Sequence, residues 1–262
     1  MATLTKDELL LRAKLADAIY PQDAKEDVFL QKPLIEAEIK GLLPDAITVT
    51  LASVGGTQFA VAICRDDTWI IFRGTDEVAD IMHDINFKKF KPSWALNFKC
   101  ASGFYKAFEA AIPRVQQLIG SSKNIRILGH SLGGSVALLT GFFLKDGRQS
   151  DIIEVTVFCS PRVFDANGVA RYNKLLGGVT TLLIDVLDPV PLMPPYSAGY
   201  RRTENPVYLS DSRGPCLYEE MSPKERALAF VWGVAAMIKK PGWQGGNEHR
   251  LSSVIKKLEM LK

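Results

Sequence analysis

The sequence predicts an α/β fold with a mostly parallel central sheet flanked by helices. Strand-like apolar runs alternate with helical patterns between residues 125 and 186, and strands separated by helices are usually parallel neighbours in one sheet. A tight turn with Gly129 and Gly133 joins one such strand to the helix that follows it. With 262 residues and 47% apolar side chains, the chain can bury a large core, so we expect one domain over residues 1–262.

The first half of the chain begins with helical patterns and continues with strands. Apolar residues recur near helical spacing up to Pro21, which predicts a helix near the N-terminus. Strands are predicted at 46–51, 59–64 and 68–72, with Gly55 and Gly56 forming a turn. A short amphipathic stretch at 77–86 and a helix at 105–119 follow.

The second half shows the regular alternation. Strands are predicted at 125–128, 153–158 and 180–186, and helices at 132–144 and near 169–176. Four prolines between 189 and 195 open an irregular stretch that lasts until about residue 221. Ser222 and Pro223 then begin an apolar helix that reaches residue 239. A Gly-rich loop at 242–247 and a terminal amphipathic helix complete the prediction.

Composition excludes several classes of protein. The net charge is only +3 and there is no basic block, so a nucleic-acid partner is not expected. The longest apolar run, 227–238, is shorter than the roughly 20 residues of a membrane span, so no integral membrane segment is expected. The four cysteines are far apart, which predicts buried thiols and neither a metal ion nor another cofactor.

The N-terminal segment bears on the location of the protein. Acidic and basic residues stand where a secretory signal would have an apolar core. This favours a cytoplasmic protein, or a secreted one if the chain is the trimmed mature form.

Residues 129–133, Gly-His-Ser-Leu-Gly, match the Gly-x-Ser-x-Gly pattern of a nucleophile elbow. In such an elbow a sharp strand-to-helix turn projects a serine hydroxyl from the carboxyl edge of the sheet, and glycine is needed where the turn is crowded. The buried strand predicted before it and the apolar helix predicted after it are the context that the motif requires. Ser131 is therefore the predicted nucleophile of a serine hydrolase.

Six further segments, in order along the chain, make the sequence resemble the class 3 lipases, the family of the fungal triacylglycerol lipases. The resemblance covers roughly residues 45–262 and implies an α/β-hydrolase fold. It departs from the family at Cys159, where glycine is usual, and at 217–240, which does not match closely. Besides GHSLGG at 129–134, the segments are IIFRGT at 70–75, GFYKAF at 103–108, VTVFCSPRV at 155–163, DPVPLMPP at 188–195, and AGYRR and PVYL at 198–202 and 206–209. The last two resemble a loop and a hairpin that follow the acid in the family.

A serine hydroxyl needs a general base, and the chain has three histidines. His249 comes late in the chain, as the Ser–Asp–His order of this fold requires, and the resemblance supports it as the base. His130, inside the elbow, is expected to be packed structure, and His83 to be solvated or at the rim of a pocket. For the acid, Asp188 follows the end of a predicted strand and is preferred, also by the resemblance, while Asp185 within that strand stays an alternative.

Ester chemistry also requires donors to a developing oxyanion. The backbone N–H of Leu132, directly after the nucleophile, is one predicted donor. The resemblance implies Thr75 as the second, through its backbone N–H and its hydroxyl. An alternative is that Thr75 is simply a turn residue after Gly74.

The family resemblance places a short lid after Thr75, at residues 76–86. An apolar stripe at helical spacing is predicted in this stretch, and His83 is among the polar residues on its other side. A fixed surface helix is an equal alternative to a lid. The helix at 222–240 either lines or caps the acyl pocket or is an ordinary buried helix. The stripe consists of Val78, Ile81, Met82 and Ile85.

Together these residues predict a carboxylic ester hydrolase of the lipase or esterase type that acts on glycerides or other lipid-like esters through an acyl-serine intermediate. Transient contact with a lipid interface fits this reading. A thioesterase, a phospholipase A or an acyltransferase would use the same residues. A non-catalytic lipase-like binding protein is disfavoured because all the catalytic positions are filled.

Overall fold

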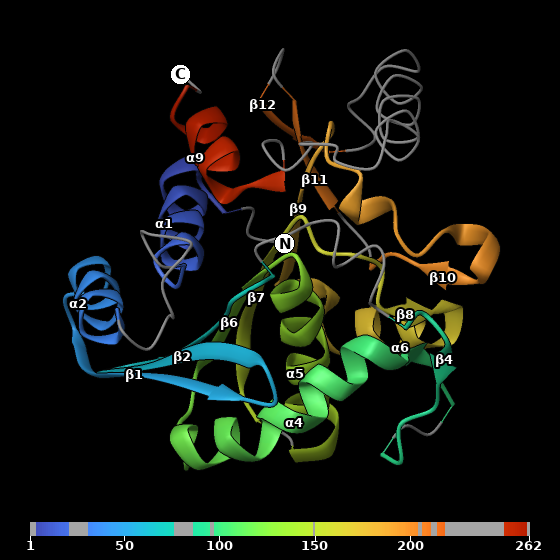
Figure 1. Ribbon diagram of the computed structural model, residues 1–262, viewed down its shortest axis with the longest axis horizontal. Helices are drawn as coiled ribbons and strands as arrows, with labels where there is room; N and C mark the ends of the chain where they lie inside the picture. Colours follow the sequence, from blue (N-terminus) through green and yellow to red (C-terminus); the bar gives the residue numbers. More distant parts are fainter. Residues whose placement is uncertain are drawn as a thin grey trace.

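The centre of the computed structural model is an eight-stranded sheet in the order β1-β2-β3-β6-β7-β9-β11-β12 (Figure 1). The five strands β3, β6, β7, β9 and β11 run parallel to one another, whereas the pairs β1–β2, β2–β3 and β11–β12 at the two ends of the sheet are antiparallel. The predicted α/β fold with a mostly parallel sheet is therefore confirmed. The strands are β1 (Ala46–Val54), β2 (Thr57–Cys64), β3 (Thr68–Phe72), β6 (Ile125–His130), β7 (Ile152–Phe158), β9 (Thr180–Asp185), β11 (Pro206–Ser210) and β12 (Gly214–Leu217).

The structure describes residues 4–20, 31–75, 86–94, 97–148, 150–203, 206–210, 214–217 and 249–260. The possible lid at 76–86, with Val78, Ile81, Met82, His83 and Ile85, lies outside them except for Asn86. The predicted helix at 222–240 and the Gly-rich loop at 242–247 lie outside them as well. No helix among the described residues is long and apolar enough to cross a membrane.

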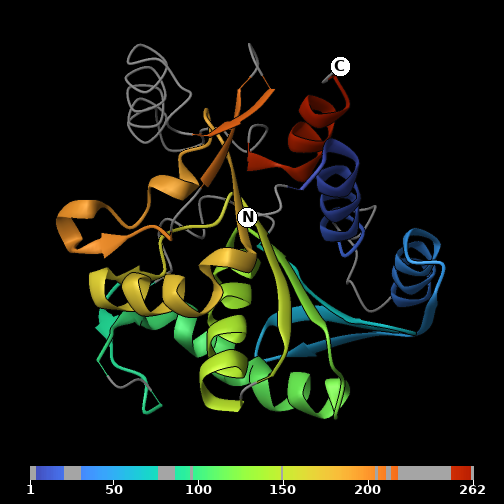
Figure 2. The same cartoon turned by 180° about the vertical axis from the view of Figure 1, so that it is seen from behind.

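Helices cover both faces of the sheet (Figures 1 and 2). On one face, α4, α5 and α6 enclose the largest apolar core, and on the other face α1, α2 and α9 enclose two smaller ones. Because both faces are covered, the central strands are largely buried, as β3 shows with all five residues buried. The helices are α1 (Lys6–Asp17), α2 (Lys32–Leu42), α4 (Ser102–Ile119), α5 (Leu132–Arg148), α6 (Ala166–Leu176) and α9 (Leu251–Glu259).

The alignment of β3 with β6 brings distant segments together at the carboxyl edge of the sheet. The two strands are parallel and in register, so that Phe72 at the end of β3 pairs with Gly129 in β6. The residues that follow β3 therefore lie beside the turn that follows β6. This edge is where open α/β sheets bind their ligands.

Helix α1 is fixed to the sheet by a buried ion pair. The guanidinium of Arg12 donates two hydrogen bonds of 2.8 Å to the carboxylate of Glu154 in β7, and both side chains are almost fully buried. Arg126 in β6 donates to the same carboxylate. Thr5 caps the N-terminus of α1 in a capping box with Glu8. The end of α1, and Tyr20 just beyond it, are thus held against the sheet.

The stretch predicted as irregular after residue 189 contains more structure than its prolines suggested. Its strands are short, and Pro206 and Pro215 weaken the strand pattern in the sequence. The hairpin that the resemblance implied near PVYL is formed by β11 and β12. The remaining elements are a second sheet of β4 (Lys89–Phe90), β5 (Cys100–Ala101), β8 (Phe164–Asp165) and β10 (Tyr200–Arg201), and the 3-10 turns η1 (Gly177–Val179), η2 (Val190–Leu192) and η3 (Tyr196–Ala198).

Candidate active site

Ser131 occupies a tight turn between the end of β6 and the start of α5. Its φ of 56° lies in the left-handed region, which is unfavourable for a residue with a side chain and often marks a functional site. The turn also requires glycine on both sides. A Cβ on Gly129 would collide with the backbone of Gly133, and one on Gly133 would lie 2.5 Å from the carbonyl oxygen of Phe72. The geometry is that of a nucleophile elbow.

Asp188 and His249 form a buried pair near this turn. Nδ1 of His249 lies 2.6 Å from Oδ2 of Asp188, and the two side chains are 3% and 0% exposed. The other carboxylate oxygen, Oδ1, accepts a hydrogen bond of 2.9 Å from the backbone N–H of Val190. Both contacts fix the carboxylate, which can orient the imidazole and stabilise a positive charge on it.

Asp185, the alternative acid, has a different partner. Its Oδ2 lies 2.6 Å from Nζ of Lys257 in α9, and its Oδ1 accepts a hydrogen bond from the backbone N–H of Leu187. Burial raises the pKa of Asp185 to about 6, against the opposing effect of Lys257. Of the two aspartates, Asp188 is the one that contacts His249.

His249 also lies beside the elbow. Its ring is 4.7 Å, centroid to centroid, from the ring of His130, the residue before Ser131. Neither Oγ of Ser131 nor Nε2 of His249 has a hydrogen-bond partner among the described residues, although both atoms are buried. A hydroxyl and an imidazole nitrogen left unpaired in the same buried region are what a serine nucleophile and its general base require.

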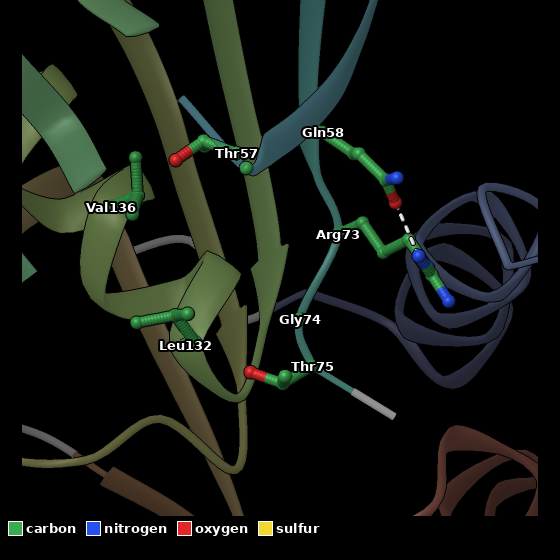
Figure 3. Close-up of a pocket in the computed structure, with 8 residues that line it drawn as sticks. Thr57, Gln58, Arg73, Gly74, Thr75, Leu132 and Val136 are labelled. Atoms are coloured by element: carbon green, nitrogen blue, oxygen red, sulfur yellow. Dashed lines mark hydrogen bonds between the residues drawn. The ribbon is translucent and has the colours of Figure 1, made fainter. Parts of the chain in front are cut away.

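The two predicted oxyanion residues line one cavity of about 130 Å³ next to the elbow. Leu132 is the first residue of α5, and the first N–H groups of a helix have no partner within it. Thr75 follows the end of β3, and Figure 3 shows its hydroxyl pointing toward the turn that carries Leu132. In the same view the Arg73 and Gln58 side chains, which are hydrogen-bonded to each other, point away from Leu132.

Two groups among the described residues hold metal-ligand atoms within 4.8 Å of one another. One is Cys159 with Asp188 and His249, and the other is Cys64 with Asp45 and Asp67. Burial raises the pKa of both thiols, of Cys64 to about 12 and of Cys159 well above its usual range. Both thiols are therefore held in the neutral form by their surroundings.

The sequence interpretation of His130 was incomplete. The residue is buried, as expected, but its Nε2 also lies 2.7 Å from the carbonyl oxygen of His249. Its Nδ1 lies 2.8 Å from the hydroxyl of Tyr20, a residue that the sequence did not single out. Nothing local to Tyr20 could have indicated this contact, because it joins residues 110 positions apart.

Comparison with known proteins places this architecture among the lipases. The family model described as lipase (class 3) matches residues 69–198. A secreted mono- and diacylglycerol lipase of Fusarium solani is 28% identical over 183 residues, which are 64% of this chain and 52% of that protein. The chain thus spans about half the length of this curated relative.

Solved structures show the same fold. A lipase from Rhizopus microsporus var. chinensis superimposes with a TM-score of 0.65 at 21% identity, covering 79% of this chain and 76% of that one. A triacylglycerol lipase, described as having a serine protease triad as its catalytic centre, has a TM-score of 0.64 at 17% identity, with 86% and 91% covered. Residues 69–198 thus match the class 3 lipases in sequence, and the chain has the α/β-hydrolase fold of these solved structures.

Proposed function

We propose that the protein is a serine carboxylic ester hydrolase that cleaves glycerides or other lipid-like esters. The observation that carries the proposal is the buried Asp188–His249 pair beside the elbow of Ser131, with Oγ of the serine and Nε2 of the histidine unpaired among the described residues. Thr75 and Leu132 at one cavity supply the oxyanion donors. In this proposal residues 1–262 act as one hydrolase domain.

The proposed reaction proceeds through an acyl-enzyme. Nε2 of His249 accepts the proton of Ser131 as Oγ attacks the ester carbonyl carbon, and Asp188 stabilises the resulting imidazolium. The backbone N–H groups of Leu132 and Thr75, with the Thr75 hydroxyl, donate to the oxyanion. The imidazolium then protonates the leaving alcohol, and the acyl group stays on Ser131 until water, activated by His249, releases the carboxylic acid.

Two considerations support a lipid-like substrate. The relative from Fusarium solani is named for mono- and diacylglycerols, and the matching solved structures are lipases. Contact with a lipid interface during catalysis is part of this proposal. We also propose that the protein is secreted rather than cytoplasmic, because that relative and a second one from Malassezia globosa are named as secreted enzymes.

A fluorophosphonate probe tests the chemistry directly, because it reacts with activated serines. We expect labelling and hydrolysis of p-nitrophenyl esters by the wild-type protein, and loss of both in Ser131→Ala. Ser135→Ala is a matched control, since Ser135 is also buried on the elbow side of α5 but hydrogen-bonds to Ser160. Normal ester turnover by Ser131→Ala would refute the proposal. Mono-, di- and triacylglycerols of increasing chain length would then define the substrate.

A further inference from the structure

A chain of hydrogen bonds runs behind the candidate site, through two residues that the mechanism does not use. The backbone N–H of Gly74 donates to the hydroxyl oxygen of Tyr20 at 2.9 Å. The same hydroxyl lies 2.8 Å from Nδ1 of His130, and Nε2 of His130 lies 2.7 Å from the carbonyl oxygen of His249. These hydrogen bonds therefore connect Gly74, the residue before Thr75, to the backbone of His249, the proposed general base.

One protonation state of His130 satisfies all three contacts. The carbonyl oxygen of His249 can only accept, so Nε2 of His130 carries a proton and donates it. In a neutral imidazole Nδ1 then accepts, so that the hydroxyl of Tyr20 donates to His130 and accepts from Gly74. The ring of His130 is fully buried and faces His249. Burial and the neighbouring charge of His249 hold the pKa of His130 well below its usual range, which keeps the ring neutral.

The close approach at Gly74 depends on its lack of a side chain. A Cβ there would lie 2.7 Å from the Tyr20 hydroxyl, 2.7 Å from the carbonyl oxygen of His130 and 2.9 Å from Cβ of Ser131. Three segments therefore meet at this point, namely the end of β3, the elbow, and the residues after α1. The buried Arg12–Glu154 pair fixes α1 to the sheet. Tyr20, which lies just after α1, is therefore held in place next to the site.

We propose that Tyr20 and His130 are positioning residues for ester hydrolysis, which hold the oxyanion segment at Gly74–Thr75 and the backbone of His249 in fixed relation to Ser131. The inference rests on the proposed function. Acyl transfer depends on donors aimed at the oxyanion and on a base held near the nucleophile. The neutral ring of His130 also allows His249 to become an imidazolium during the reaction without a like charge 4.7 Å away.

The first test is Tyr20→Phe, which removes the hydroxyl and keeps the ring. We expect kcat on a soluble p-nitrophenyl ester to fall about 10- to 100-fold, with KM changed less than threefold, because a misplaced catalytic group affects the transition state rather than substrate binding. Tyr172→Phe is the matched control, since its buried hydroxyl bonds to Thr180 within another part of the fold. We expect Tyr172→Phe to be destabilised about as much as Tyr20→Phe, while its kcat stays at the wild-type value. Equal kcat in Tyr20→Phe and wild type would overturn the proposal.

A second pair of variants covers the case in which Tyr20→Phe does not fold. His130→Gln retains an N–H donor that can reach the carbonyl oxygen of His249, whereas His130→Leu has no donor. We expect His130→Gln to keep at least tenfold more of the wild-type kcat than His130→Leu. Equal activity of the two would contradict the positioning role.

The tautomer can be measured on the wild-type protein. In ¹⁵N-labelled protein, two-bond ¹H–¹⁵N correlations should show His130 protonated at Nε2 and neutral between pH 8 and pH 5.5. Protonation at Nδ1, or titration of this ring within that range, would overturn the hydrogen-bond chain. A wild-type protein without esterase activity would refute the proposed function and leave this spectrum as the separate test of the chain.

Discussion

Nδ1 of His249 lies 2.6 Å from Oδ2 of Asp188, and both side chains are buried away from solvent. Asp185, three positions earlier, is equally buried but pairs with Lys257. Two aspartates at the end of one strand thus have separate partners. The difference allows their roles to be distinguished by single isosteric substitutions.

Asp188→Asn should lower kcat by about four orders of magnitude, because an amide can neither fix the required tautomer nor stabilise the imidazolium. Asp185→Asn should keep kcat within about tenfold of the wild type, since its carboxylate contacts Lys257 and not the base. Steady-state turnover of a p-nitrophenyl ester measures both. If kcat falls as far in Asp185→Asn as in Asp188→Asn, the assignment of Asp188 as the catalytic acid is wrong.

Thr75→Val should reduce kcat by about 100-fold if the hydroxyl donates to the oxyanion, because loss of one such donor costs about 10²- to 10³-fold. Thr75→Ser keeps the hydroxyl and should stay within about fivefold of the wild type. Pre-steady-state release of p-nitrophenol reports the acylation step for both. If the two variants are equal, the hydroxyl of Thr75 is not a donor and only its backbone can be.

Glu154→Gln should destabilise the fold by about 3–5 kcal/mol, because it leaves the buried Arg12 without its counter-charge, whereas Arg126 keeps its ion pair with Asp67. Glu259→Gln is the matched control. It removes an ion pair with Lys14 that is 42% and 51% exposed, and such surface pairs contribute at most about 1 kcal/mol. Urea unfolding at neutral pH measures both variants, and equal losses would show that burial of the Glu154 cluster is unimportant.

Asp185 should make stability depend on pH in a defined direction. Its pKa is about 6 in the folded protein and about 4 in an unfolded chain. Between these values the folded state binds more protons, so the contribution of this group to the free energy of unfolding decreases as pH rises from 4 to 6. Asp185→Asn cannot titrate. The stability of the wild type relative to this variant should therefore fall across that window in urea titrations, and a rise would contradict the assignment.

The sequence predicted the parts of the fold whose patterns are local. The strands before and after the elbow and the helix after it have clear apolar periodicity, and their predicted bounds are within a few residues of β6, α5 and β7. The hairpin of β11 and β12 was not visible in the strand pattern, because short strands interrupted by proline carry a weak signal. Only the family resemblance indicated it.

For the site, the elbow motif, the residue order along the chain and the family resemblance together were enough to propose Ser131, Asp188 and His249. The contact between Tyr20 and His130 could not be predicted in this way. It depends on where α1 packs against the sheet, which is set by the burial of Arg12 with Glu154 across 142 positions. Interactions of this kind follow from tertiary packing and leave no periodic trace in the sequence.

The packing of α1 against α9 has a consequence for how the protein acquires activity. The two helices share one buried apolar cluster, and Lys6 contacts the backbone of Glu259 across 253 positions. His249 lies two residues before α9, so the proposed general base reaches its place only when this long-range contact forms. Closing such a long loop is entropically costly and slow. During refolding from denaturant, esterase activity should therefore return after the helical circular dichroism signal, as a marker of the final docking step.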